Sequence, residues 1–379
     1  MIDMTIRTGF DEEHAMFRES VQRFFKSELA PNLDRFEHQG TTDRQFWTKA
    51  GAAGLLCPQV PTEYGGLGLD FRYNAIVAEE LAYCGTAIAM GVHSDITPDY
   101  IMDFGSEALK NQWLPGMVSG EVIAAIVMTE PGAGSDLARL RTIARQDGDR
   151  YVVNGSKTYI SNGQNADLGI VAVRTGGEGA GGISMLAIDL RGEGIVRGRN
   201  LDKIGQWSAD TSELFFEDAV VPAGNLIGEV GQGFAIMMKQ LPQERLSIAI
   251  SAQAYAQRAL DEAIEYTKQR SAFGKTVFEL QNTRFALADC ATQLQVGWAH
   301  LDWAIGRLIA GNLTPAQASA AKLWHSEKQW KVVDTALQMH GGAGYMNEYS
   351  IARLWRDSRV MRIYGGTSEI MKEIVARSL

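Results

Sequence analysis

The chemistry of this sequence is most concentrated in one short stretch, Met128-Thr129-Glu130-Pro131-Gly132-Ala133-Gly134-Ser135-Asp136. An apolar run at 123–127 precedes it and predicts a buried β-strand that ends in a turn. The glycines let the backbone of such a turn approach a ligand closely, and its N–H groups can face an anion or the polar edge of a ring. Thr129 and Ser135 place a hydroxyl at each end. The spacing is equally compatible with a tight connection that binds nothing.

Three later segments carry charged or polar side chains near the expected ends of helices. Glu244 and Arg245 stand together in Leu241-Pro242-Gln243-Glu244-Arg245-Leu246, shortly after a proline that can open a helix. By itself, a glutamate at this position favours the first turn of a helix, and Arg245 could form an ion pair on the helix surface. Arg270 could satisfy the last carbonyls of a helix, and Thr367 could cap a helix whose N-terminus can also receive an anion.

The composition is that of an ordinary soluble globular protein and excludes several function classes. The chain has 379 residues, of which 45% are hydrophobic and 21% charged, and this length predicts two or three subdomains. Its formal net charge is -9, without a block of like charges, which argues against nucleic acid as a main partner. No apolar run reaches the ~18 residues that a membrane span needs.

The cysteine and histidine spacing predicts neither a disulfide framework nor a metal site. Cys57, Cys84 and Cys290 are far apart and odd in number, so reduced thiols with structural roles are expected. The six histidines lack the spacing of metal ligands. The segment 1–14 has neither an apolar signal core nor an Arg/Ser-rich transit pattern, which predicts a cytoplasmic chain or one already processed.

The elements that must position the chemistry fall into three successive groups. Residues from 11 to 120 have mainly helical periodicity. From 121 to 228, short β-branched runs alternate with turns, which predicts an antiparallel barrel or sandwich. Long apolar seams, such as 287–308, then predict an antiparallel helical bundle. The predicted fold class is therefore α+β with three domains, namely helices at 1–120, antiparallel strands at 121–228 and a four-helix bundle at 229–379.

Local signals predict where several elements begin and turn. Asp70 and Ser106 are candidate N-caps of two N-terminal helices. Asn154-Gly155 predicts a type I′ hairpin turn, because both residue types tolerate positive φ. The glycine-rich run at 176–182 lies between two expected strands and opens no helix, so it predicts a flexible loop rather than a phosphate loop. Pro242 is expected to end one helix and to open the next.

Four ordered groups of motifs together resemble the acyl-CoA dehydrogenase family. The stretch 128–136 resembles its first signature, and Gly155-Ser156-Lys157-Thr158-Tyr159-Ile160-Ser161-Asn162-Gly163 resembles its flavin-contacting strand. Arg270-Ser271-Ala272-Phe273-Gly274-Lys275 fits the same family. Gln338-Met339-His340-Gly341-Gly342-Ala343-Gly344-Tyr345, with Arg356-Asp357 and Tyr364-Gly365-Gly366-Thr367-Ser368-Glu369-Ile370, resembles its second signature. The resemblance implies a homotetramer that holds FAD between the β domain and the bundle, partly across a subunit interface.

The resemblance also implies roles for individual residues. Thr129 and Ser161 would contact the flavin ring system, Ser135 would lie near the phosphates and the substrate, and Tyr159 replaces a tryptophan against the ring face. The other residues with an implied cofactor role are Arg270, Phe273, Gln281, Gln338, Gly341, Gly342, Thr367 and Glu369. The residues with an implied substrate role are Ser135, Arg245, Tyr364, Gly365 and Gly366.

One departure from the family pattern carries the catalytic prediction. Many members have a glutamate base directly after the tyrosine that matches Tyr364, where this chain has Gly365. One branch, which includes long-chain and isovaleryl-CoA dehydrogenases, places its carboxylate where this chain has Glu244. Both changes are expected together if the two positions face one cavity from opposite walls. Glu244 is therefore the predicted base, with a pKa that burial raises and the start of a helix lowers.

The implied reaction is the α,β-dehydrogenation of a saturated, medium-to-long-chain acyl-CoA. Glu244 would take the α-proton, FAD would take the hydride, and an electron-transferring flavoprotein would receive the electrons. The backbone N–H of Gly365 and a ribityl hydroxyl of FAD would stabilise the enolate. Two alternatives stay open at this point. One is an acyl-CoA oxidase or flavin monooxygenase on the same fold, and the other is a non-catalytic relative that binds FAD or acyl-CoA.

Overall fold

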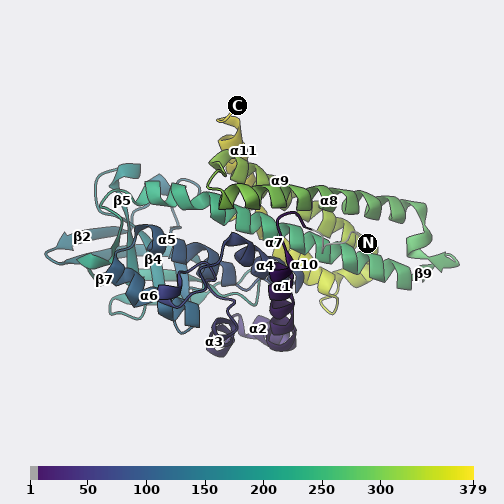
Figure 1. Cartoon of the computed structure of the whole chain (residues 1–379), viewed down its shortest axis with the longest axis horizontal. Helices are drawn as coiled ribbons and strands as arrows, with labels where there is room; N and C mark the ends of the chain where they lie inside the picture. Colours follow the sequence, from purple (N-terminus) through teal and green to yellow (C-terminus); the bar gives the residue numbers. More distant parts are fainter. Residues whose placement is uncertain (1–6) are drawn as a thin grey trace.

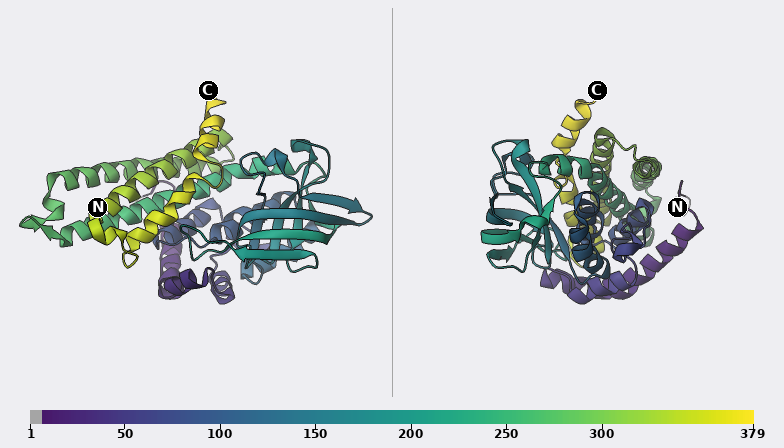
Figure 2. Two further views of the ribbon diagram at one scale, coloured as in Figure 1. Left: turned by 180° about the vertical axis from the view of Figure 1, so that it is seen from behind. Right: turned by 60° about the vertical axis from the view of Figure 1, so that its left-hand side comes forward.

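The computed structural model describes residues 7–379 and confirms the predicted succession of helices, sheet and helices (Figure 1). Residues 1–6, on which the localisation prediction partly rests, lie outside the described residues. The sheet occupies one end of the molecule, and three long helices form the opposite end, one of which reaches back to the sheet (Figures 1 and 2). The N-terminal helices pack beside the junction of these two parts.

The N-terminal helices form one side of the core. They are α1 (Glu12–Phe24), α2 (Leu33–Gln39), α3 (Arg44–Ala52), α4 (Phe71–Tyr83), α5 (Thr97–Phe104) and α6 (Glu107–Ser119). The predicted caps are confirmed, since the Asp70 side chain accepts from the Arg72 N–H and the Ser106 side chain from the Leu109 N–H. A π-helical turn, η4 (Val92–Ile96), leads directly into α5. Such turns are rare and often lie near functional sites.

The central region is one eight-stranded sheet. Its strands are β1 (Ala124–Val127), β2 (Ile143–Asp147), β3 (Arg150–Ser161), β4 (Leu168–Arg174), β5 (Ile183–Asp189), β6 (Ile195–Asn200), β7 (Thr211–Pro222) and β8 (Leu226–Ile227). They follow the order β6-β7-β3-β2-β4-β5-β8, and β1 pairs with β4. The expectation of a purely antiparallel arrangement is wrong at β4, which pairs in parallel with β1 and, at one residue, with β2. Intervening strands separate β4 from both partners in the chain, so a long connection permits the parallel direction.

The predicted hairpin turn at Asn154-Gly155 is wrong. Both residues lie inside β3, where the pairing with β7 shifts register between Val153 and Gly155. The β2–β3 turn falls instead at Gly148, whose φ is 62°. A Cβ on Gly155 would stand 2.6 Å from Thr142 Cα, so the glycine serves a close backbone approach and a bulge. The glycine-rich run at 176–182 does connect two strands, as predicted.

The C-terminal region consists of three long helices and two short ones. The long helices are α7 (Gly233–Gln269), α8 (Gln281–Ile309) and α9 (Pro315–His340), and the short helices are α10 (Ser350–Ser358) and α11 (Ser368–Ala376). A small hairpin of β9 (Ser271–Ala272) and β10 (Lys275–Thr276) joins α7 to α8 at the far end of the molecule (Figure 1). Thr314 caps α9 through a capping box with Gln317.

The predicted break at Pro242 is wrong, because α7 continues through it. A proline inside a helix costs about 3 kcal/mol, but α7 packs against α4 and α9 along its length, and tertiary packing supplies most helical stability. Glu244 therefore lies several turns from the N-terminus of α7 rather than in a first turn. The helix dipole acts mainly over the terminal turn, so the predicted lowering of the Glu244 pKa by a helix start is also wrong.

Candidate functional site

Glu244 lies in the interior, where α5 crosses α7. Its side chain is buried, with a residue exposure of 7%, and the Tyr100 hydroxyl on α5 donates to its Oε1 at 2.9 Å. Burial raises the pKa of Glu244 to about 7, and the Tyr100 hydrogen bond and the Arg245 charge only partly oppose this shift. A carboxylate with such a pKa can accept a proton near neutral pH and return it.

The backbone of Gly365 and Gly366 packs against α7 beside this carboxylate. Their φ values are 65° and 99°, a region that other residues rarely adopt. A Cβ on Gly365 would lie 2.3 Å from Cδ1 of Ile248, which is one turn beyond Glu244 on α7. The space that a side chain at 365 would enter is therefore already occupied from α7. This arrangement agrees with a carboxylate at 244 and none at 365.

Two buried cations hold the carbonyls of the same segment. Arg245 Nε donates to Gly365 O at 3.4 Å, and Lys322 Nζ on α9 donates to Gly366 O at 2.6 Å. Arg245 also donates to Ser319 Oγ at 3.2 Å. Within residues 7–379, neither cation forms an ion pair with a carboxylate. Burial and then the Arg245 charge lower the pKa of Lys322 to about 8. Lys322 was not predicted from the sequence, although a lysine in a small apolar helical run, Ala320-Ala321-Lys322-Leu323, was a usable signal.

The turn at 128–136 is braced from the sheet. Thr158 N donates to Thr129 O at 2.9 Å, which joins the turn to β3. Lys157, also on β3, is fully buried, and its Nζ contacts Glu130 Oε1 at 2.8 Å and Met128 O at 3.0 Å. Glu130 and Lys157 were part of the motifs but were not predicted to have this role. Burial lowers the pKa of Lys157 to about 8, while the lysine charge holds the pKa of Glu130 below its usual value against burial.

The residues predicted to lie near the flavin belong to this turn and to β3. Thr129 and Ser161 are half-buried, and Ser135 is exposed. Tyr159 is 70% exposed and has a φ of 58°, at a register shift between Lys157 and Ile160. Strain of this kind costs of order 1–3 kcal/mol and often marks a ligand site. An aromatic side chain held out of the protein in this way is suited to stack on a planar ligand.

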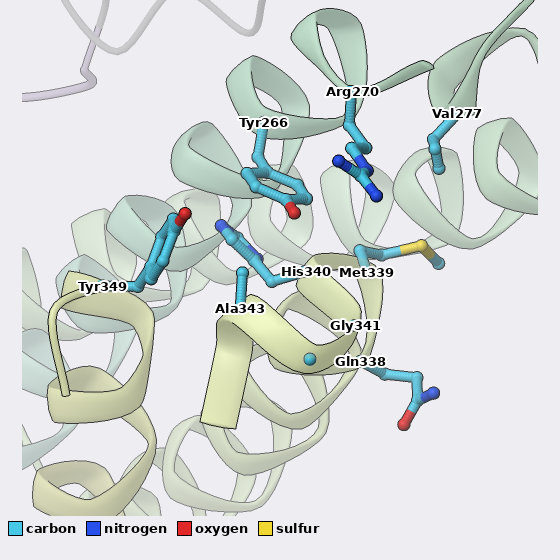
Figure 3. Close-up of a pocket in the computed structure, with 10 residues that line it drawn as sticks. Tyr266, Arg270, Val277, Gln338, Met339, His340, Gly341, Ala343 and Tyr349 are labelled. Atoms are coloured by element: carbon cyan, nitrogen blue, oxygen red, sulfur yellow. The ribbon is translucent and has the colours of Figure 1, made fainter. Parts of the chain in front are cut away.

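A second group of predicted residues lines a pocket at the other end of α7 (Figure 3). The pocket has a volume of about 460 Å³, and Arg270, Gln338, Gly341 and Gly342 line it. Arg270 extends from the end of α7 toward the turn that follows α9 (Figure 3). A Cβ on either glycine would meet nothing within 4 Å, so the backbone there is open to a ligand. Arg270 is exposed and can offer a forked cation to a phosphate.

The remaining predicted residues divide between the two ends of α7. Phe273 turns the β9–β10 hairpin and is 92% exposed, and Gln281 is the exposed first residue of α8, so both lie near Arg270. Thr367 caps α11, with its Oγ1 accepting from Ile370 N, and Glu369 lies in the first turn. Both residues closely follow Gly365 and Gly366 in the chain, so they lie on the Glu244 side of α7 and not near Arg270.

One chain therefore does not bring all the predicted site residues together. Arg270 follows Glu244 by 26 residues on the same helix, a separation of about 39 Å at 1.5 Å per residue. The sheet lies at one end of the molecule, and the β9–β10 hairpin that follows Arg270 lies at the opposite tip (Figure 1). The residues at both ends fit FAD: a braced polar turn and an exposed ring at one, and open glycines with an arginine at the other.

Within residues 7–379, no helix is long and apolar enough to cross a bilayer, and no cluster of three or more ligating side chains could hold a metal ion. The three cysteines are free, and Cys57 and Cys290 are buried. Burial raises the pKa of the Cys57 thiol far above its usual value, which agrees with a structural role.

Three family models match the chain in order. They are the acyl-CoA dehydrogenase N-terminal domain at residues 11–121, the middle domain at 125–219 and the C-terminal domain at 231–379. The chain is 45% identical over 383 residues to the long-chain specific acyl-CoA dehydrogenase of Sus scrofa mitochondria, covering 100% of this chain and 89% of that protein.

Solved structures agree with these matches. An acyl-CoA dehydrogenase from Geobacillus kaustophilus superposes with a TM-score of 0.97 at 46% identity and covers 98% of this chain and 99% of its own. An acyl-CoA dehydrogenase from Bacillus anthracis, solved in complex with FAD, superposes with a TM-score of 0.93 at 32% identity over 98% of this chain and 67% of its own.

Proposed function

The chain belongs to the acyl-CoA dehydrogenase family, and we propose that it oxidises a saturated, medium-to-long-chain acyl-CoA to the trans-2-enoyl-CoA. It is an oxidoreductase, and its cofactor is FAD. The observation that carries the proposed reaction is the buried Glu244 carboxylate, which has a pKa of about 7 and lies on α7, one turn before the Ile248 side chain that packs against Gly365. A non-catalytic relative would have no need to hold a carboxylate in this costly environment.

Glu244 acts as the base in this proposal. The α-C–H bond of the thioester breaks and its proton passes to the Glu244 carboxylate. FAD, when bound, supplies the acceptor for the hydride that leaves the β-carbon. The negative charge that develops on the thioester oxygen is stabilised by the N–H of Gly365. Arg245 and Lys322 contribute by fixing the carbonyls of Gly365 and Gly366, and their positive charges favour an anion close by.

The chain length and the electron acceptor are the finer parts of the proposal. The similarity to a long-chain specific dehydrogenase supports a long acyl chain, and the family resemblance supports an electron-transferring flavoprotein as acceptor. A panel of straight and branched saturated acyl-CoAs tests the first. Rapid mixing of the reduced enzyme with air tests the second, because fast reoxidation with peroxide would identify an oxidase or monooxygenase instead. The cytoplasmic localisation stays a prediction.

A homotetramer is supported by surfaces that one chain leaves uncovered. Large apolar side chains are exposed along α8 and at the β9–β10 hairpin, namely Phe273, Phe285, Val296, Trp303 and Ile309. The separation of about 39 Å between Glu244 and Arg270 exceeds the reach of one FAD, so Arg270 would serve the cofactor of another subunit. Analytical ultracentrifugation of the FAD-loaded protein tests the assembly state.

The variant Glu244→Gln tests the proposed reaction. Removing the base at nearly constant shape should lower the rate of flavin bleaching by an acyl-CoA, measured anaerobically, by about 10²–10⁴-fold. Glu262→Gln is the matched control, since Glu262 lies further along α7 and pairs with Arg258. Bleaching by Glu244→Gln at the parental rate would overturn the proposal.

A further inference from the structure

Tyr100 is the hydrogen-bond partner that the structure gives to the Glu244 side chain. It is fully buried, with an exposure of 0%, and its hydroxyl donates to Glu244 Oε1 at 2.9 Å. Among residues 7–379, no other group donates to this carboxylate, so Oε2 carries no hydrogen bond from the chain. The two oxygens of the carboxylate are thus distinguished, one held and one free.

The position of Tyr100 is fixed by a polar contact between α5 and α7. Gln243 Nε2, from the residue before Glu244, donates to Asp95 O at 2.8 Å and also contacts the Asp99 carboxylate. One turn earlier, Gln240 Nε2 donates to Asp99 O at 3.2 Å and to Asp103 Oδ2 at 3.0 Å. These bonds hold the two segments in register and so fix the backbone of Tyr100 relative to Glu244.

Resting on the function proposed above, we propose that Tyr100 is the positioning residue of the base. It fixes Oε1 of the ionised Glu244 and leaves Oε2 to receive the α-proton of the thioester. A phenol that donates to a carboxylate favours its charged form, so it also keeps the base ready to accept a proton. After the transfer, the proton sits on Oε2 and the Tyr100 bond weakens, because a neutral acid is a poorer acceptor.

The charges around Glu244 allow this effect to be isolated. The groups that act on its pKa are Tyr100 from α5 and Arg245 from α7, and both lower it against burial. Burial and the neighbouring Glu244 and Asp99 charges raise the pKa of Tyr100 far above its usual value, so the phenol remains a donor across the working range. Lys322 on α9 bonds the Gly366 carbonyl and not the carboxylate. Loss of the hydroxyl therefore removes one stabiliser of the ionised base and leaves the others.

The test is the FAD-loaded Tyr100→Phe variant, with Tyr255→Phe as the matched control. Tyr255 is equally buried, lies on α7, and its hydroxyl has no hydrogen-bond partner within the described chain. Tyr100→Phe should move the acidic limb of the kcat/KM profile upward by about one pH unit and lower kcat several-fold, with KM nearly unchanged. The carboxyl C=O stretch of Glu244, identified by its absence in Glu244→Gln, should titrate upward by the same amount in infrared difference spectra. Tyr255→Phe should leave both readouts unmoved.

The outcomes separate this proposal from the proposed function. Parental activity in Glu244→Gln would remove the base itself and the proposed function with it. An inactive Glu244→Gln, together with a Tyr100→Phe profile and infrared titration identical to the parent, would overturn only the role of Tyr100. A uniform loss of rate at every pH without a shift would also overturn it, since that result indicates packing alone. If Tyr100→Phe fails to fold, the infrared titration of Gln243→Leu should show the same upward shift from a loosened α5, and no shift there would count against the proposal.

Discussion

The surroundings of Glu244 and of Arg270, which lie far apart along α7, differ in burial and in hydrogen bonding. Around Glu244, the side chains of Tyr100, Glu244 and Arg245 are buried and form hydrogen bonds within one chain. At the Arg270 end, the predicted site residues are exposed around an open pocket and have few partners (Figure 3). The first end is built to tune protonation, because burial shifts a pKa strongly. The second end is open, so its groups could bind a ligand without first losing internal partners.

This contrast predicts which properties a substitution changes at each end of α7. Changes at the Glu244 end should alter both stability and chemistry, since buried groups there hold the packing of α5, α7 and the Gly365 segment. Changes at the Arg270 end should alter binding with little effect on the stability of the protein without cofactor. The predictions below test this division.

Arg270→Gln should give the largest loss of FAD affinity among the substitutions at the Arg270 end. Losing a charge-assisted contact to a phosphate costs about 1.5–3 kcal/mol, which corresponds to a tenfold to hundredfold weaker affinity for FAD. The urea midpoint of the apoprotein should not change, because Arg270 is exposed. Fluorescence titration with FAD measures the affinity, and Lys268→Gln is the charge-matched control. A destabilised apoprotein would show that the two ends are not separable.

Gly365→Ala tests the opposite end and should lower both stability and activity. Its φ of 65° costs a non-glycine residue about 1–2 kcal/mol, and the new Cβ would force Ile248 Cδ1 away from 2.3 Å. Gly181→Ala is the control, since that loop glycine has no neighbour within 4 Å. Urea unfolding and acyl-CoA-dependent bleaching measure the two effects. An unchanged urea midpoint would contradict the close packing of Gly365 against Ile248.

The sequence predicted local hydrogen bonds better than contacts between distant segments. The helix caps at Asp70, Ser106 and Thr367 were predicted because they depend on bonds within a few residues. The continuity of α7 through Pro242 was missed because packing from distant helices overrides the local preference. The contact of Tyr100 with Glu244 joins residues 144 apart in the chain, and no local periodicity encodes such a pair.

Two buried acids, Asp95 on η4 and Asp99 on α5, predict a pH dependence of stability. Burial raises the pKa of Asp95 and of Asp99 to about 7, far above the usual value near 4 in an unfolded chain. Between these two pKa values the native state binds more protons than the unfolded state, so stability should fall as pH rises from about 4 to about 7. Asp99→Asn should make this slope shallower by ~1.4 kcal/mol per pH unit in urea unfolding. An unaltered slope would mean that Asp99 does not carry a proton in the folded protein.

Gly342→Ala should give the smallest effect. It tests whether the cofactor reaches the glycine turn as well as Arg270. Its φ is not positive and an added Cβ meets nothing within 4 Å, so the apoprotein should keep its urea midpoint to within about 0.5 kcal/mol. The methyl group would instead stand in the pocket that Arg270 and Gln338 line. If FAD approaches this backbone, its affinity should fall several-fold while Gly224→Ala, an open glycine outside the pocket, leaves it unchanged. Unchanged affinity in Gly342→Ala, beside a weakened Arg270→Gln, would place the phosphate at the arginine but keep the cofactor away from the glycine turn.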